Sequence, residues 1–199
     1  MTFPLLWLRS SLTVMIALGV IGAVALSAPA AQADPVNLGK CNGATLSTPF
    51  VPWADPSSYE LAPGGDFESS TWSLTGHAAV VGGSEPFAAT GARGDWSLSL
   101  PAGSSAQSPP TCVDAAYPTI RLFASGAGTM AVGVAYDGVS MPAGVAVVLG
   151  GWQPTPLMLT SSALPAALSG GTTDVSLVLT TLTGNVRVDD VFIDPWNRG

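Results

Sequence analysis

The sequence predicts an all-β protein whose short antiparallel strands pack as a sandwich or barrel. Three observations point to this fold class. Apolar and polar residues alternate over several short stretches, with the period of a half-buried strand. Turn-forming residues such as paired glycines separate these stretches at short intervals. The chain also holds 23 Gly and 17 Pro among its 199 residues, and so many helix breakers leave little room for long helices.

The alternation places the expected strands in the second half of the chain. Residues 96–100 alternate large apolar residues with serine, and residues 130–136 place three apolar side chains and a tyrosine on one face. The same pattern predicts strands at residues 120–124, 145–149, 175–179 and 186–188. Because each stretch is short and is followed by a turn signal, we expect neighbouring strands to be antiparallel.

Composition and charge exclude several classes of protein. Only 10% of the residues are charged and 47% are apolar, which excludes an intrinsically disordered chain. The formal net charge is −7 with six Lys and Arg residues in total, too few to build a basic surface for nucleic acid. The single lysine, Lys40, among many Ala and Gly residues is typical of a GC-rich bacterial genome.

The first 33 residues are expected to be a signal peptide outside the folded body. Arg9 is the only charged residue before Asp34, and a largely apolar stretch follows it. Residues 31–33 read Ala-Gln-Ala and supply the small residues that signal peptidase requires, so we expect cleavage before Asp34 and secretion. The alternative is an uncleaved segment that anchors the protein in a membrane, because about 20 apolar residues can span a bilayer.

The mature chain is expected to consist of an extended Pro-rich arm, residues 34–63, and a β-sandwich domain, residues 64–199. The two cysteines, Cys41 and Cys112, favour one disulfide bond between arm and body, since exported domains with an even number of cysteines are commonly disulfide-bonded. Two buried free thiols are the alternative. Aromatic residues of the arm, such as Phe50 and Trp53, would help to hold it against the body.

The two ends of the expected domain carry its most specific motifs. Residues 64–68 read Gly-Gly-Asp-Phe-Glu, with Trp72 shortly after them, and residues 188–191 read Val-Asp-Asp-Val. The alternation of the last strand points Asp190 toward the core, where a carboxylate needs a cation or several hydrogen-bond donors. Asp189 is expected to face solvent or to pair with an arginine.

With these motifs the chain resembles the carbohydrate-binding-module type of jelly roll, the galactose-binding-like β-sandwich. Many of its members open with a Gly-Asp-Phe-Glu-like turn followed by Trp and close with an Asp-Asp-Val strand. The resemblance spans about residues 64–194. It implies a two-sheet antiparallel jelly-roll sandwich in which the strand at residues 186–193 pairs near the one at residues 67–74.

The resemblance also implies a structural calcium ion. Carried over by position, the ligands would be Glu68 and Asp190, with Asp66 as a helper, and loop carbonyls would complete the six to eight oxygen ligands that calcium takes. The alternative is that Glu68 caps a turn and Asp190 accepts backbone hydrogen bonds without a metal.

Three aromatic residues are the candidates for sugar binding, which in jelly rolls relies on exposed rings. Trp152 follows two glycines and shortly precedes a proline, which predicts an exposed loop position. Tyr136 and Tyr117 are the reserve candidates, and the alternative for each ring is packing beneath a loop. The small residues at 131, 133 and 135 argue against a dense polar groove on their face of the sheet.

Catalytic patterns are sparse, and we expect no enzymatic activity. His77 is the only histidine and follows a glycine in a turn, and no Gly-x-Ser-x-Gly elbow is present. The three glutamates form no recognisable catalytic pair.

Three function classes stay open. The first is a secreted, non-catalytic binding module for carbohydrate or cell-wall glycan. The second is a structural or adhesion protein of the bacterial cell envelope without a small ligand. The third is an enzyme, which the sparse catalytic groups disfavour. Two or more exposed aromatic residues lining a groove would favour the first, and a flat apolar patch the second. We expect no nucleic-acid partner, and no membrane partner once the signal segment is cleaved.

Overall fold

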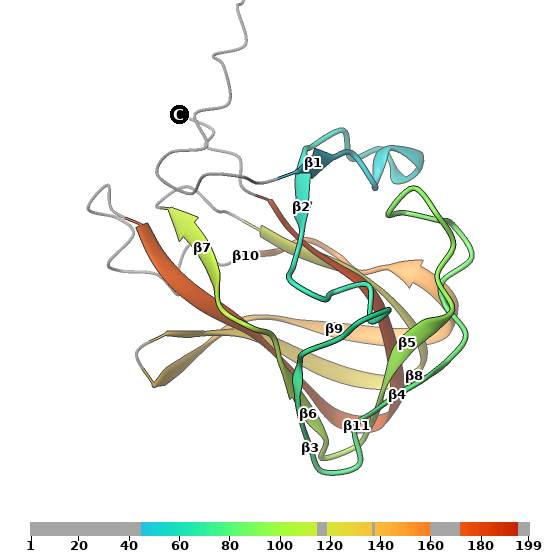
Figure 1. Cartoon of the computed structure of the whole chain (residues 1–199). Coiled ribbons are helices and arrows are strands. Elements are labelled where there is room, and N and C mark those ends of the chain that lie inside the picture. Colours follow the sequence, from blue (N-terminus) through green and yellow to red (C-terminus); the bar gives the residue numbers. More distant parts are fainter. Residues whose placement is uncertain (1–44, 115–118, 137, 160–171, 195–199) are drawn as a thin grey trace, which may run out of the picture. The chain divides into compact units, whose positions relative to one another are not determined.

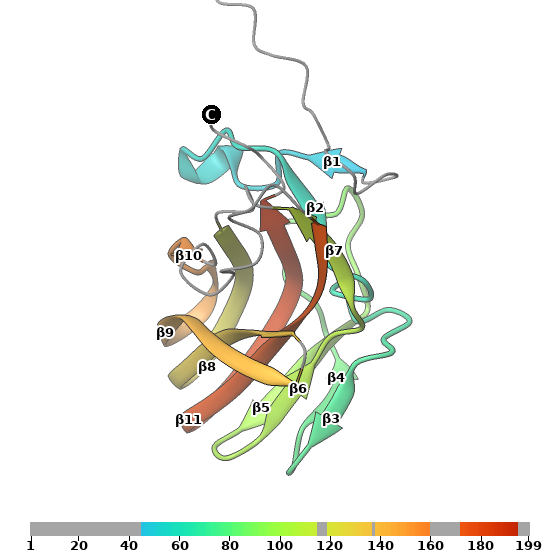
Figure 2. The same cartoon turned by 90° about the vertical axis from the view of Figure 1, so that its left-hand side faces the viewer.

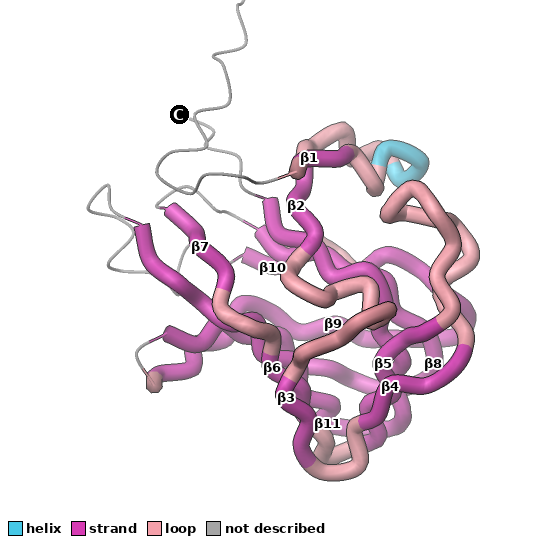
Figure 3. The backbone as a smooth tube through the Cα atoms, in the orientation of Figure 1, coloured by secondary structure: helices cyan, strands magenta, loops and turns pink. Residues whose placement is uncertain are grey.

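Eleven strands and one short 3-10 helix make up the part of the chain that the computed structural model describes, residues 45–114, 119–136, 138–159 and 172–194. These residues all belong to one compact unit, 34–199. Figure 3 shows how strands dominate the backbone. The elements are β1 (Leu46–Ser47), η1 (Val51–Trp53), β2 (Tyr59–Leu61), β3 (Ser73–Thr75), β4 (Ala79–Gly82), β5 (Trp96–Pro101), β6 (Ser105–Gln107), β7 (Thr111–Asp114), β8 (Thr119–Tyr136), β9 (Val139–Pro154), β10 (Met158–Leu159) and β11 (Thr172–Asp194).

Three long strands organise the sheet. β11 pairs with β8 from Ser176 to Asp194, and β9 pairs with the other side of β8. The opposite side of β11 pairs in turn with β7, β6, β5 and β2 (Figure 1). Every described pair is antiparallel, so the predicted all-β antiparallel architecture is confirmed.

The sheet curves because its long strands bend where glycines remove side chains. The pairing of β11 with β8 shifts register between Thr181 and Thr183, and Gly184 follows with a φ of +72°. A Cβ atom at Gly184 would lie 2.0 Å from the carbonyl oxygen of Ala127 on β8. Only glycine fits this close approach and this left-handed backbone without strain.

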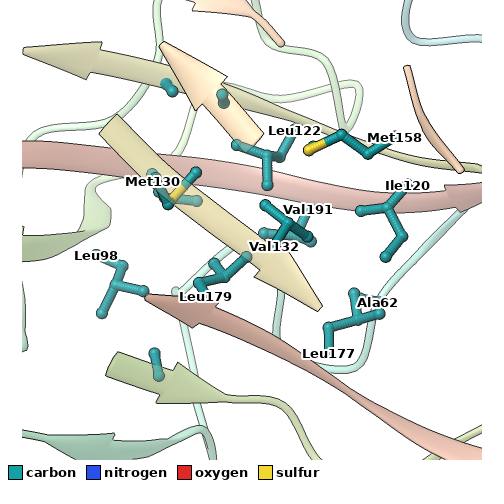
Figure 4. Close-up of a cluster of buried hydrophobic side chains, with 14 of the residues drawn as sticks. Ala62, Leu98, Ile120, Leu122, Met130, Val132, Met158, Leu177, Leu179 and Val191 are labelled. Atoms are coloured by element: carbon teal, nitrogen blue, oxygen red, sulfur yellow. The ribbon is translucent and has the colours of Figure 1, made fainter. Parts of the chain in front are cut away.

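The larger of two hydrophobic clusters in the described residues fills the inside of the curve. Alternate residues of β5, β8 and β11, including Leu98, Met130 and Leu179, point into it, and Met158 of β10 joins them (Figure 4). Burying one such side chain stabilises the fold by about 1.5–3 kcal/mol, so this alternation fixes which face of each strand points inward. Figures 1 and 2 show the sheet curving around this region.

The last strand meets the opening motif through its backbone. The Val191 N–H donates to the carbonyl of Gly65 at 3.1 Å, and the Ala62 N–H donates to the carbonyl of Val191 at 2.8 Å. Residues 60–61 of β2 pair with β11, whereas residues 73–75 pair with β6. The two ends therefore lie together as the resemblance implied, with the contact at residues 60–65 rather than 67–74.

Two expectations fall wholly or partly outside the described residues. Cys112 lies on β7, but Cys41 and the signal segment at residues 1–33 are not described, so the disulfide bond and the cleavage remain predictions. Among the described residues, no helix is long and apolar enough to cross a membrane.

Candidate functional site

A cleft of about 680 Å³ lies between the N-terminal arm and the loop that joins β4 to β5. This volume is within the range of small-molecule binding sites. The arm contributes Ser47, Thr48, Pro49, Pro52 and Trp53, and the loop contributes residues 87–91, beginning with Phe87. We call this hollow the aromatic cleft.

An aromatic cluster holds the arm wall of the cleft. Phe50 of the arm is fully buried and packs against Tyr59, Phe123 and Phe192, with ring centroids 4.9, 5.3 and 5.5 Å away. Trp53 follows three residues later at the end of η1, and its backbone N–H donates to the carbonyl of Phe50 at 2.9 Å. The buried phenylalanine therefore fixes where the tryptophan ring is presented.

A partly buried ion pair also anchors the arm. The Arg121 Nη1 of β8 lies 2.7 Å from the Asp55 Oδ2, with each side chain 11% exposed. The Tyr59 hydroxyl donates to the same carboxylate at 2.6 Å. Burial by itself would raise the pKa of Asp55, but hydrogen bonds from Tyr59, Ser57 and Arg121 outweigh it and lower the pKa.

A buried glutamate shapes the loop wall of the cleft. Glu85 is 1% exposed, and its two carboxylate oxygens accept hydrogen bonds from the backbone N–H groups of Phe87 and Ala89. Between these residues Ala88 adopts a left-handed conformation, with a φ of +55°. The glutamate thus organises the turn that presents the Phe87 ring.

Asp189 of β11 anchors the same loop from the core side. Its Oδ2 accepts hydrogen bonds from the Ser84 hydroxyl at 2.7 Å and from the Glu85 N–H at 2.8 Å. Asp189 is 0% exposed, so the expectation that it faces solvent is wrong. The alternation does place Asp189 on the outward face, since its pairing with Phe123 of β8 is regular, but the loop that carries Ser84 and Glu85 covers this face.

The carboxylates behind the loop share one poorly solvated region. Burial raises the pKa of Asp189 to about 6, against the hydrogen bonds that it accepts. Burial, and then the charges of Asp189 and Glu85, raise the pKa of Asp190 to about 8. None of these three residues lines the cleft, so their role toward it is to hold the loop.

The aromatic cleft presents ring surface and hydroxyl groups. Phe87 is 41% exposed, and its ring lies edge-on to Trp53 with centroids 4.9 Å apart. The lining residues include Ser47, Thr48 and Thr90 but no charged residue. Chemically, this arrangement suits a neutral ligand with one apolar face and polar edges.

A second hollow, of about 400 Å³, contains one of the expected ligand residues. Tyr136 at the end of β8 lines it together with Gln107 of β6, Ser140 of β9 and Asp174 of β11. The small residue Ala135 also lines it. Of the small residues at 131, 133 and 135, only Ala135 lines this hollow, and its polar groups come from neighbouring strands. We call this the Tyr136 groove.

Trp152 occupies a strand and not a loop. It lies within β9, is half-buried and packs against the aromatic cluster of Phe50. The Arg187 guanidinium lies over its ring at 5.7 Å and also donates to the carbonyl of Gly83 at 2.7 Å. The strand continues because Gly150 still pairs with Gly126 and Gln153 with Ala124, and Trp152 lies at the irregularity in pairing between them. Its role in ligand binding remains a prediction, and Tyr117 lies outside the described residues.

The three expected calcium ligands lie in two different surroundings. Glu68 is exposed, and its Oε1 accepts hydrogen bonds from the N–H groups of Asp95 and Trp96 at 2.8 and 2.9 Å. Asp190 is buried beside Asp189 and Glu85, and the charge of Asp66 also acts on it. No group of three acidic, histidine or cysteine side chains placed to hold a metal is found within the described residues. Calcium binding remains a prediction.

Sequence reasoning missed the pair that faces the cleft. Trp53 was expected only to hold the arm, and Phe87 was not considered. Both rings directly follow a proline and lie outside the predicted strands, and this Pro-aromatic pattern was the available signal. The sequence did not reveal that these two segments, 34 positions apart, meet. Their contact depends on the anchors of the arm and the loop, such as Phe50 and Glu85.

No family model matches the sequence, and no curated protein matches it either. Among solved structures, it is similar to a family 61 carbohydrate-binding module in complex with β-1,4-galactotriose, with 14% identity, a TM-score of 0.43, and coverage of 65% of this chain and 94% of that one. It is also similar to a Clostridium thermocellum xylanase 10B fragment complexed with xylohexaose, with 17% identity, a TM-score of 0.44, and coverage of 71% and 29%. A third is a family 6 module from Clostridium stercorarium in complex with cellobiose, with 12% identity, a TM-score of 0.41, and coverage of 64% and 87%.

Proposed function

We propose that this chain is a secreted, non-catalytic module that binds neutral glycan in the aromatic cleft. The observation that carries the proposal is the edge-to-face pair of rings, Trp53 and Phe87, in a hollow without charged lining residues. A pyranose ring has an apolar C–H face that packs on an aromatic ring, and hydroxyl edges that hydrogen-bond to groups such as Ser47 and Thr90. Function is argued from this site because a fold alone does not determine what a protein binds.

Preorganisation supports the same proposal. The arm wall is held by the ion pair of Arg121 with Asp55, and the loop wall is held by Glu85 and Asp189. A ligand that enters a preformed site does not have to order its walls, so less free energy is lost on binding. Stacking on two rings removes apolar area from water at about 25 cal/mol per Å², which is consistent with affinity in the micromolar to millimolar range.

The experiment is a glycan array followed by calorimetric titration of the purified protein with the best neutral oligosaccharide. Trp53→Ala and Phe87→Ala are each expected to weaken binding at least about tenfold, because each removes one stacking surface. Trp96→Ala is the matched control, since this tryptophan is 45% exposed and lies outside the cleft lining. Failure of the native protein to bind any neutral glycan would overturn the proposal.

Two further variants separate this site from the other candidates. Tyr136→Ala tests the Tyr136 groove, which offers one ring with an amide and a carboxylate. Trp152→Ala tests the ring that sequence analysis favoured. If either abolishes binding with an unchanged melting temperature while Trp53→Ala does not, the glycan site lies there and the cleft assignment is wrong.

The envelope-structural function is a second candidate, because one observation favours it. Val145, Val147 and Leu149 expose three large aliphatic side chains in a row on β9. A protein of this kind would bind no soluble glycan and would remain with the cell envelope when cells are fractionated. The array and the fractionation together distinguish the two functions.

A further inference from the structure

The aromatic cleft holds few polar side-chain groups. Among the described residues that line it, the only ones are the indole N–H of Trp53 and the hydroxyls of Ser47, Thr48 and Thr90. The Thr90 hydroxyl already donates to the carbonyl of Ala92 at 3.2 Å. The other described lining residues are proline, phenylalanine, alanine and glycine. A hexose carries a hydroxyl group on most of its carbons, so the cleft offers fewer partners than such a sugar presents.

The backbone of the cleft does not make up for this shortage. A free N–H is missing at six of the ten described lining residues, because they are prolines or because the group already donates within the protein: Pro49, Pro52, Trp53, Phe87, Ala89 and Gly91. A sugar hydroxyl that leaves water without finding a partner weakens binding. The cleft therefore favours a neutral sugar that has fewer hydroxyl groups.

The two rings of the cleft stand almost at right angles to each other. The planes of Trp53 and Phe87 are inclined by 81°, with the ring centroids 4.9 Å apart. A pyranose that stacks its C–H face on one ring has the other ring beside its edge, whichever of the two carries the face. The C5 substituent of a hexopyranose is equatorial and points outward, close to the plane of the sugar. The upright ring thus meets this substituent and not a second sugar face.

From these two observations we infer that the aromatic cleft selects 6-deoxyhexoses, the neutral sugars whose C5 substituent is a methyl group. The inference rests on the proposed function, since it names the class of sugar that the same site binds. A methyl group packs on the upright ring and removes apolar area from water. A hydroxymethyl group would instead place a hydroxyl against the apolar wall. An enclosed apolar pocket disfavours an added hydroxyl by about a hundredfold, and we expect at least about fivefold where the Phe87 ring stays 41% exposed.

The first test is a glycan array on which each 6-deoxyhexose stands beside its fully hydroxylated counterpart, such as D-fucose beside D-galactose and L-rhamnose beside L-mannose. Both members of each bound pair are then titrated against the purified protein. The 6-deoxy member is expected to bind at least about fivefold more tightly. Equal affinities, or tighter binding of the hydroxylated member, would overturn this inference and leave the proposed function intact. No binding anywhere on the array would overturn the proposed function, and this inference with it.

Ala88→Asn tests whether the shortage of polar groups sets the preference. Ala88 lines the cleft with a φ of +55°, a left-handed conformation that Asn and Gly both tolerate. The new amide supplies a partner for the hydroxymethyl group, so the ratio of the two affinities should fall at least about threefold. Ala88→Gly is the matched control, because it adds no polar group and should keep the native ratio. An unchanged ratio in Ala88→Asn, or an equal fall in both variants, would contradict the inference.

Discussion

Arg121 and Asp55 form an ion pair of 2.7 Å that fastens the N-terminal arm to the long strand β8. The guanidinium also lies 4.5 Å above the ring of Phe50, so one side chain contacts both the polar and the aromatic anchor of the arm. Because the same arm carries Trp53, this contact links the stability of the arm to the geometry of the aromatic cleft.

Arg121→Met is therefore expected to lower stability and to weaken glycan binding together. The variant keeps most of the apolar length of the side chain but leaves the partly buried Asp55 carboxylate without its cation, which costs about 2 kcal/mol of unfolding free energy. Chemical denaturation measures the loss. Arg93→Met, at an exposed arginine, is the control and should change the unfolding free energy by less than about 0.5 kcal/mol. An unchanged midpoint in Arg121→Met would show that the ion pair does not hold the arm.

Glu85→Ala is expected to loosen the loop wall of the cleft. Both carboxylate oxygens accept backbone N–H groups in this loop, and alanine would leave those of Phe87 and Ala89 without their acceptors. Amide hydrogen exchange at these two residues should accelerate more than at β5, and glycan affinity should fall. Glu68→Ala is the comparison, because Glu68 accepts N–H groups at residues 95 and 96, outside the cleft lining. Equal exchange rates at Phe87 in the native protein and in Glu85→Ala would contradict this role.

Much of the fold was predictable because it depends on local alternation. The inward positions Leu98, Leu122, Val132 and Leu179 follow directly from period-two patterning, and all four are buried. The lengths of the strands were not predictable, since β8 runs through a stretch rich in Gly and Ala that separated two shorter expected strands. Neighbouring strands supply the pairing that keeps this stretch extended, and such tertiary support is invisible in the local pattern.

The candidate site was less accessible from the sequence. Tyr136 lines a hollow, whereas the simple alternation that pointed Asp190 inward gave the wrong surroundings for Asp189. Asp189 lies on the outward face, as the alternation predicts, but a loop about a hundred positions earlier in the chain covers that face, and no local pattern shows this. For the same reason, the meeting of Trp53 with Phe87 depends on long-range anchors and not on either local sequence.

Stability is expected to fall as pH rises from about 5 to about 8.5 in the presence of a chelator. In the unfolded chain both aspartates have the ordinary value of 3.8, whereas in the fold burial raises the pKa of Asp189 to about 6 and that of Asp190 to about 8. The folded state thus binds protons more tightly than the unfolded state. The stability that these two carboxyl groups contribute is therefore complete below their unfolded pKa and is lost as pH rises through their folded pKa values. The melting temperature should drop by several degrees across this window.

Asp190→Asn isolates the contribution of one carboxyl group to this pH dependence. The amide cannot ionise, so the melting temperature of the variant should fall much less between pH 6 and 8.5 than that of the native protein. At pH 8.5 the variant should melt at or above the native melting temperature. Asp174→Asn is the control, because Asp174 is exposed and should leave the profile unchanged. A native profile that rises with pH, or an equal decline in Asp190→Asn, would show that the buried carboxyl group does not titrate in this range.

Calcium is expected to reverse that pH dependence if Glu68 and Asp190 bind it. A cation stabilises the ionised carboxylate, so its binding competes with the proton on Asp190 and strengthens as pH rises. Adding millimolar calcium to chelator-treated protein should therefore raise the melting temperature by more at pH 8 than at pH 5.5. Glu68→Gln and Asp190→Asn should each abolish this increase, and Asp174→Asn should retain it. Magnesium, which demands a smaller and more rigid octahedral site, should give a smaller increase. If calcium leaves the native melting temperature unchanged at both pH values, the acidic residues act through hydrogen bonds alone.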